Sequence, residues 1–200
     1  MKPNTKVAIL ISLVLGVVLL ALSYGLGKGN AFLLLNHDLG KVADTFFTYW
    51  THTADGAVWV LVTLLVLLFK RKQILLALSS IIFSTLFAQL SKNIFFKGSP
   101  RPALAITDHS LFHSVQGVEL HSLNSFPSGH TTTAFTIFLL ATILIDKKWV
   151  LPIGLLYASL AGYSRIYLAQ HFPIDVAGGI IAAILTIWIS TGIQKRWGKN

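Results

Sequence analysis

The sequence contains no cysteine and few charged residues. The absence of cysteine excludes disulfides and thiolate metal sites. Only 12% of the 200 residues are charged, where a soluble domain has about a quarter, and 54% are hydrophobic. Acidic residues are the scarcer charged class, with seven Asp and Glu against sixteen Lys and Arg. This composition indicates an integral membrane protein rather than a soluble globular domain.

Linkers and repeats are also missing. No Pro- and Gly-rich linker, internal repeat or low-complexity segment divides the chain, so we expect residues 1–200 to form a single domain. No basic stripe interleaved with aromatic residues is present, and we therefore expect no nucleic-acid partner. The basic residues are instead expected to face the lipid bilayer and its anionic headgroups.

Apolar runs recur along almost the whole chain. A helix needs about 20 apolar residues to cross the hydrocarbon core, and six runs reach or approach that length. They span Val7–Gly27, Gly56–Phe69, Ile74–Phe96, Thr131–Ile145, Trp149–Leu168 and Ile174–Ile193. The second and fourth are short and extend into polar sequence, which is tolerated beside protein or a water-filled site. The predicted fold is all-α, a polytopic membrane protein with six transmembrane helices, of which the first is retained.

The charge distribution predicts the orientation. With the N-terminus in the cytoplasm and six crossings, ten of the sixteen basic residues lie on the cytoplasmic side with one acid, Asp146. The other six basic residues lie outside with the six remaining acids, so the net charge of +9 falls on one face. All seven histidines fall on the outer side. We expect a multi-pass protein of a bacterial inner membrane, with cytoplasmic termini and an active site that faces the periplasm or exterior.

Ionisable residues gather at three helix junctions on that outer side. Such residues are costly within a membrane, and they commonly mark a functional site. Lys92 and Arg101 lie at and after the end of the third run, and His130 begins the fourth. Arg165, His171 and Asp175 lie where the fifth run ends and the sixth begins.

The segment Pro127-Ser128-Gly129-His130 opens the fourth run. Ser128 is able to cap a helix, and Gly129 lets the backbone approach a ligand closely. The free N–H groups and the positive end of a helix bind anions. We expect a phosphate-like group here, with His130 beside it to move a proton. The alternative is an ordinary capped helix start with an incidental histidine.

His171 and Asp175 are one helical turn apart if the sixth helix begins near Pro173. Asp175 is then expected to accept a hydrogen bond from one imidazole nitrogen, which leaves the other as a nucleophile. Arg165 offers a planar fork of donors to phosphoryl oxygens. Taken alone, the His–Asp pair is equally consistent with a polar helix cap.

Together these residues resemble the phosphatidic acid phosphatase type 2 superfamily. The family comprises membrane lipid phosphatases, bacterial non-specific acid phosphatases and vanadium haloperoxidases, and it has three motifs in this order. The second matches Pro127-Ser128-Gly129-His130, and the third matches Ser164-Arg165, His171 and Asp175. The first departs, because eight residues instead of six separate Lys92 from Arg101-Pro102, and only three separate Lys97. We assign Lys92 to the motif and expect Lys97 to reach the membrane interface.

The resemblance implies a role for each matching residue. His171 attacks phosphorus and forms a phosphohistidine, Asp175 orients it, and His130 protonates the leaving oxygen and then helps to activate water. Five residues hold the phosphoryl oxygens: Lys92, Arg101, Ser128, Gly129 and Arg165. No metal or other cofactor is required.

The predicted function is hydrolysis of phosphate monoesters or diphosphates of membrane lipids, such as undecaprenyl diphosphate, phosphatidylglycerol phosphate or phosphatidic acid. The alternatives are a lipid phosphotransferase or a lipid A phosphatase with the same site, and an anion transporter. His109, His113 and His121 have no accompanying H-E-x-x-H pattern. We expect them to lie in a loop that lines the substrate mouth rather than to bind a metal. His37, His52, Asp38, Asp44 and Asp55 are expected to be polar structure of the outer loops, with the segment Thr51–Gly56 packed under the active site.

Overall fold

The computed structural model describes residues 2–198, and every regular element in that range is helical. The α-helices are α1 (Pro3–Leu26), α2 (Lys28–Leu35), α3 (Lys41–Trp50), α4 (Val58–Phe69), α5 (Ile74–Leu90), α6 (Pro102–Ala105), α7 (Gly129–Leu144), α8 (Val150–Tyr167) and α9 (Pro173–Trp197). Shorter helical turns are η1 (Thr51–Ala54), η2 (Arg71–Gln73), η3 (Ser91–Phe95) and η4 (His109–Leu111). The prediction of an all-α fold is confirmed.

Each of the six apolar runs forms a helix, but not each helix has the length and hydropathy of a membrane span. Among the described helices, three qualify: α1, the α5 segment Arg71–Phe95, and α9. A fourth span results if Lys41–Ala54 and α4, which meet at a 54° bend, cross the membrane together. Helix α7 has only 16 residues, and the polar turn around Arg165 lowers the mean hydropathy of α8. The chain is therefore a membrane protein, and the six crossings stay a prediction.

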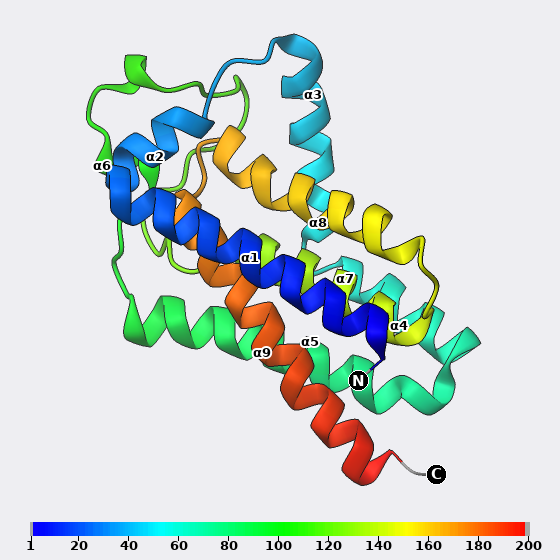
Figure 1. Ribbon diagram of the computed structural model, residues 1–200. Coiled ribbons are helices and arrows are strands. Elements are labelled where there is room, and N and C mark those ends of the chain that lie inside the picture. The colour runs from blue at the N-terminus through cyan, green and yellow to red at the C-terminus, as the bar shows by residue number, and fades with distance from the viewer. Residues whose placement is uncertain (1, 199–200) are drawn as a thin grey trace.

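Helix α9 lies at the centre of the bundle, where it packs against α1, α5 and α7 (Figure 1). Small residues on α9 let the other helices approach closely. A Cβ atom on Gly179 would lie 2.7 Å from the carbonyl oxygen of Ser128 and 2.8 Å from the Cβ of Thr131. The second turn of α9 thus packs closely against the start of α7, next to the predicted site residues.

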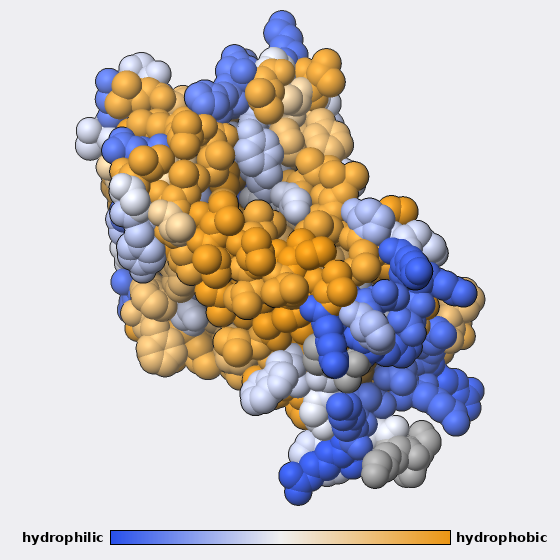
Figure 2. Space-filling view, viewed as in Figure 1, coloured by the Kyte–Doolittle hydropathy of each residue, from blue (hydrophilic) through white to orange (hydrophobic). Residues whose placement is uncertain are grey.

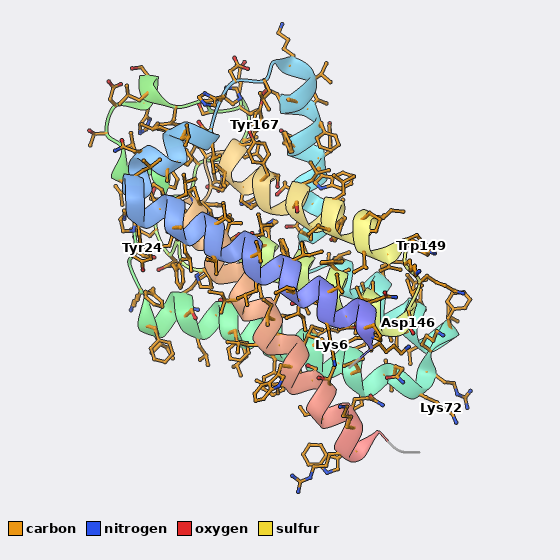
Figure 3. The ribbon with its side chains drawn as sticks, in the orientation of Figure 1. Lys6, Tyr24, Lys72, Asp146, Trp149 and Tyr167 are labelled. Carbon is orange, nitrogen blue, oxygen red and sulfur yellow. The ribbon has the colours of Figure 1, made fainter. Side chains whose placement is uncertain are left out.

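One end of the bundle carries most of the basic residues, and we call it the basic end. Lys2 pairs with Asp146 at 3.3 Å, which fixes the start of α1 to the turn between α7 and α8. Gln194, near the end of α9, donates to the carbonyl of Lys72 at 3.0 Å. Figure 3 shows Lys6, Lys72 and Asp146 at this end. In Figure 2, hydrophilic residues gather there beside a broad hydrophobic surface, as a protein in a bilayer requires.

The opposite end, here called the loop end, contains α2, α3, α6 and the largely irregular segment between α6 and α7 (Figure 1). Asn36 joins these parts. Its Nδ2 donates to the carbonyls of Ile166 and Tyr167 at 2.9 Å each, and its Oδ1 accepts from the backbone N–H of His113 at 2.7 Å. The loops are therefore fixed to the end of α8.

Candidate active site

The three predicted motifs meet at the loop end. The backbone N–H of Ser128 donates to the carbonyl oxygen of Asp175 at 2.9 Å, which joins the second motif to the third. Nη1 of Arg101 donates to the carbonyl of Gln170 at 3.2 Å, immediately before His171. Arg101 is only 8% exposed, so its guanidinium is held among the loops rather than in open solvent.

His171 and Asp175 are both buried, with 1% and 3% of their surfaces exposed. Their Nδ1 and Oδ2 atoms are 3.5 Å apart, an ion-pair distance that is too long for the expected hydrogen bond. The reason is that Oδ2 already accepts from Ser125 Oγ and from the backbone N–H of Phe172 at 2.9 Å. The carboxylate is thus fixed by the backbone and Ser125, and it faces Nδ1 of His171.

His171 lies in the turn between α8 and α9. Burial, together with the charges of Arg101, Arg165 and Lys92, lowers the pKa of His171 well below its ordinary value. The imidazole is therefore neutral at physiological pH, with a lone pair available for attack. Three cations around one neutral, buried imidazole form an environment suited to a dianionic ligand.

The start of α7 provides backbone N–H groups toward the same region. Ser128 is the N-cap, and its Oγ accepts from Thr131 Oγ1 at 2.9 Å and from the Thr131 backbone N–H at 3.4 Å. A Cβ atom on Gly129 would lie 3.9 Å from Nζ of Lys92. Lys92 therefore lies beside the helix start, whereas Lys97 is exposed. The assignment of Lys92 to the first motif stays a prediction, and this placement favours it over Lys97.

Arg165 is 7% exposed and belongs to the last turn of α8. Its Nη1 donates to Oγ1 of Thr51 in η1 at 2.6 Å. Its Nε is buried and has no hydrogen-bond partner among the described residues. A buried, unsatisfied guanidinium donor is costly unless a ligand accepts from it.

His130 has a partner that the sequence analysis did not assign to the site. Its Nε2 lies 2.6 Å from Oδ1 of Asp55, and Oδ2 of Asp55 lies 2.8 Å from Nδ1 of His52. His52 and Asp55 were expected to be polar structure of the outer loops, in a segment packed under the active site, but not to contact a site residue. The available signal was their position in the polar extension of a short apolar run. These residues, with Thr51, Arg165 and His121, line a pocket of about 340 Å³.

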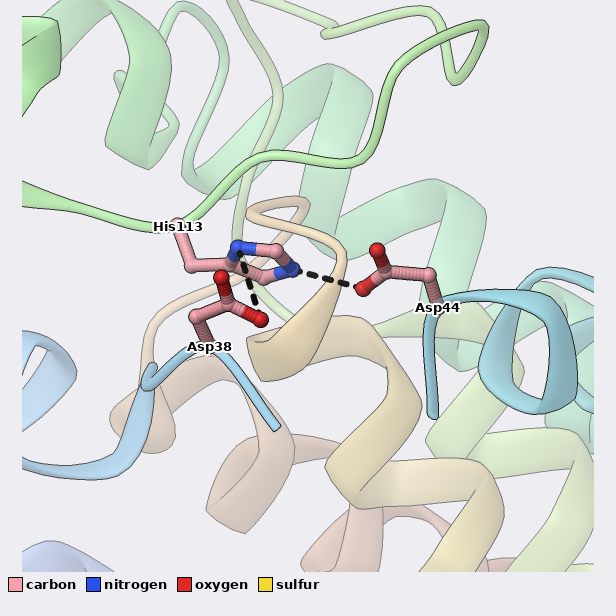
Figure 4. A group of neighbouring side chains, drawn as sticks. All are labelled: Asp38, Asp44 and His113. Carbon is pink, nitrogen blue, oxygen red and sulfur yellow. Dashed lines mark hydrogen bonds and ion pairs between the residues drawn. The ribbon is translucent and has the colours of Figure 1, made fainter. Parts of the chain in front are cut away.

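The remaining loop histidines lie in different surroundings. His121 lines the pocket, as expected, but His109 does not, and its Nε2 donates to the carbonyl oxygen of Ala103 at 2.9 Å. His113 lies between two carboxylates, with Nε2 at 2.8 Å from Asp44 and Nδ1 at 3.9 Å from Asp38 (Figure 4). Asp44 also accepts from the hydroxyl of Tyr167 at 2.6 Å. His113 therefore connects loops and does not line the pocket, contrary to our expectation.

The family model of the PAP2 superfamily matches residues 73–199. The chain belongs to the PAP2 superfamily. Every residue of the three motifs lies within the matched range, whereas His52 and Asp55 lie before it.

Several PAP2 relatives and solved structures are similar to the chain. It is 32% identical over 150 residues to the undecaprenyl-diphosphatase BcrC of Bacillus subtilis, covering 72% of each chain. It is 29% identical over 170 residues to an undecaprenyl-diphosphatase of Sulfolobus acidocaldarius, covering 80% of this chain and 73% of the relative. The crystal structure of Aquifex aeolicus LpxE superposes with a TM-score of 0.71 at 30% identity, covering 82% of this chain and 93% of the other. The crystal structure of a transmembrane PAP2 type phosphatidylglycerolphosphate phosphatase from Bacillus subtilis has the same fold, with a TM-score of 0.62 at 21% identity over 98% of each chain.

Proposed function

We propose that the protein hydrolyses phosphate monoester or diphosphate groups of membrane lipids through a phosphohistidine intermediate. The observation that carries the proposal is the burial of His171 close to Arg101, Arg165 and Lys92, which together lower the pKa of its imidazole. A neutral imidazole is a nucleophile, and the cations stabilise the charge on the transferring phosphoryl group.

In the first step, Nε2 of His171 attacks phosphorus while Asp175 faces Nδ1 and stabilises the positive charge that forms on the ring. The P–O bond to the lipid breaks, and protonated His130 gives its proton to the leaving oxygen. Burial and the charge of Arg165 lower the pKa of His130 to about 3, so the protonated ring depends on the bound phosphate dianion and the carboxylate of Asp55 to stabilise it. The side chains of Lys92, Arg101 and Arg165, with Ser128 and the Gly129 amide, hold the equatorial oxygens. The electron pair of the broken bond stays on the leaving oxygen, which the proton neutralises.

In the second step, His130, now neutral, accepts a proton from water as the water attacks phosphorus. The N–P bond breaks, the electron pair returns to His171, and inorganic phosphate leaves. The cycle restores both histidines. It requires no metal, because cations and amides provide all of the phosphoryl contacts.

The site is proposed to face the periplasm or exterior of an inner membrane that the chain crosses six times. The names of the relatives support an undecaprenyl diphosphate substrate. The likeness to LpxE and to a lipid A 4'-phosphatase of Bacteroides thetaiotaomicron supports lipid A phosphate as the second candidate. Transfer of the phosphoryl group to another lipid uses the same intermediate. An anion transporter fits less well, because the buried ionisable residues gather at the loop end of the bundle and not near its middle.

The test is phosphate release by the purified protein in detergent from a panel of undecaprenyl diphosphate, phosphatidylglycerol phosphate, phosphatidic acid and lipid A. We expect activity in the presence of EDTA and inhibition by vanadate, which mimics the phosphoryl transition state. Thin-layer analysis of the lipid products distinguishes hydrolysis from transfer. Activity that disappears in EDTA and returns with a divalent ion would contradict the metal-free mechanism.

A further inference from the structure

The turn between α3 and α4 lies outside the three motifs, yet it forms one wall of the pocket that His130 and Arg165 also line. Oδ1 of Asp55 lies 2.6 Å from Nε2 of His130, and its Oδ2 lies 2.8 Å from Nδ1 of His52. Asp55 is therefore held between two histidines, with one carboxylate oxygen directed to each.

The same turn also holds Arg165. Oγ1 of Thr51, at the start of η1, accepts from Nη1 of Arg165 at 2.6 Å. Two residues of the proposed mechanism, His130 and Arg165, thus obtain their positions from five consecutive residues, 51–55. A turn that merely closed a helix pair would not contact both.

We propose that Asp55 is the positioning residue of His130, an inference that rests on the proposed function. The Nε2–H of His130 donates to Asp55, which fixes the plane of the imidazole and directs Nδ1 to the leaving oxygen. In the protonated ring both nitrogens carry a hydrogen, and the nearby carboxylate stabilises that charged form. The proton on Nδ1 passes to the leaving oxygen and returns from water, while Nε2–H stays bonded to Asp55.

If Asp55 positions His130, the loss of activity on replacing Asp55 depends on whether the leaving group needs a proton. An alkoxide, such as the one released from phosphatidic acid, needs a proton in the transition state, whereas the nitrophenolate released from p-nitrophenyl phosphate does not. Loss of Asp55 is therefore expected to slow the lipid reaction and to spare the aryl reaction. A turn with a purely structural role would slow both reactions together.

The experiment compares Asp55→Asn, Asp55→Glu and the matched control Asp108→Asn, a change of an exposed carboxylate that caps η4 and does not line the pocket. In Asp55→Asn we expect a loss of about 10- to 100-fold in kcat on phosphatidic acid and of less than about threefold on p-nitrophenyl phosphate. Asp55→Glu restores part of the lipid activity, and Asp108→Asn retains activity on both substrates. In a His130→Ala background, Asp55→Asn causes a further loss of less than about twofold, because the two residues act as a unit.

Equal losses on the two substrates in Asp55→Asn, or losses that multiply in the double variant, would overturn the inference and leave the proposed function intact. A wild-type protein that releases phosphate from no lipid phosphate would overturn the proposed function, and the inference with it.

Discussion

The backbone N–H of Ser128 donates to the carbonyl oxygen of Asp175 at 2.9 Å, so the first turn of α7 is fixed directly to the first turn of α9. This bond brings the anion-binding helix start within reach of the proposed nucleophile. It forms because Gly179 has no side chain to separate the two helices. A small residue four positions after Asp175 therefore determines the geometry of the site.

Gly179→Ala is expected to force α7 and α9 apart at the site. The added methyl group would lie 2.7 Å from the Ser128 carbonyl oxygen and 2.8 Å from the Cβ of Thr131, distances that require movement of the backbone. We expect a loss of about 1–3 kcal/mol in stability, measured by thermal unfolding in detergent, and reduced turnover.

The matched control is Gly192→Ala in the same helix, where a Cβ atom meets nothing within 4 Å. This change is expected to stabilise α9 by up to about 1 kcal/mol, through helix propensity alone. Similar behaviour of the two variants would show that the close approach at Gly179 is unimportant.

Removing His130 and removing His171 are expected to have different effects on substrates with different leaving groups. His171→Ala abolishes turnover on both phosphatidic acid and p-nitrophenyl phosphate and forms no acid-labile phosphoenzyme, because the nucleophile is gone. His130→Ala loses about 10²–10⁴-fold on the lipid and retains more activity on the aryl phosphate. A phosphoenzyme that persists in His171→Ala would contradict the assignment of the nucleophile.

The placement of the two lysines predicts a clear ranking. Lys92→Ala removes a cation beside Gly129 and His171, so we expect turnover to fall by about 10²–10³-fold. Lys97→Ala removes an exposed charge, and the expected change is less than about threefold. Steady-state phosphate release measures both, and the reverse ranking would assign Lys97 to the first motif.

The proposed orientation is testable because the native chain has no cysteine. Ser114 is exposed at the loop end, and Lys147 is exposed at the basic end. We expect Ser114→Cys to react with an impermeant thiol reagent in spheroplasts, and Lys147→Cys to react only after the membrane is disrupted. Labelling in the opposite order would place the active site in the cytoplasm.

Several features were determined by the sequence itself. The all-α membrane fold followed from the scarcity of charge and the recurrence of apolar runs, and the structure confirms that each run is helical. The cap at Ser128 was also predictable. Such features are local, since they depend on composition and on contacts within one helical turn.

Other features were decided only by the tertiary structure. The contacts of Asp55 with His130 and of Thr51 with Arg165 join segments far apart in the sequence, and no local pattern encodes them. The same holds for His113, which pairs with Asp44 instead of lining the pocket. Even the one-turn pair of His171 and Asp175 differs from expectation, because Ser125, 50 residues away, takes the carboxylate oxygen. Helix periodicity places residues on a face, but the packing of α7, α8 and α9 decides which faces meet.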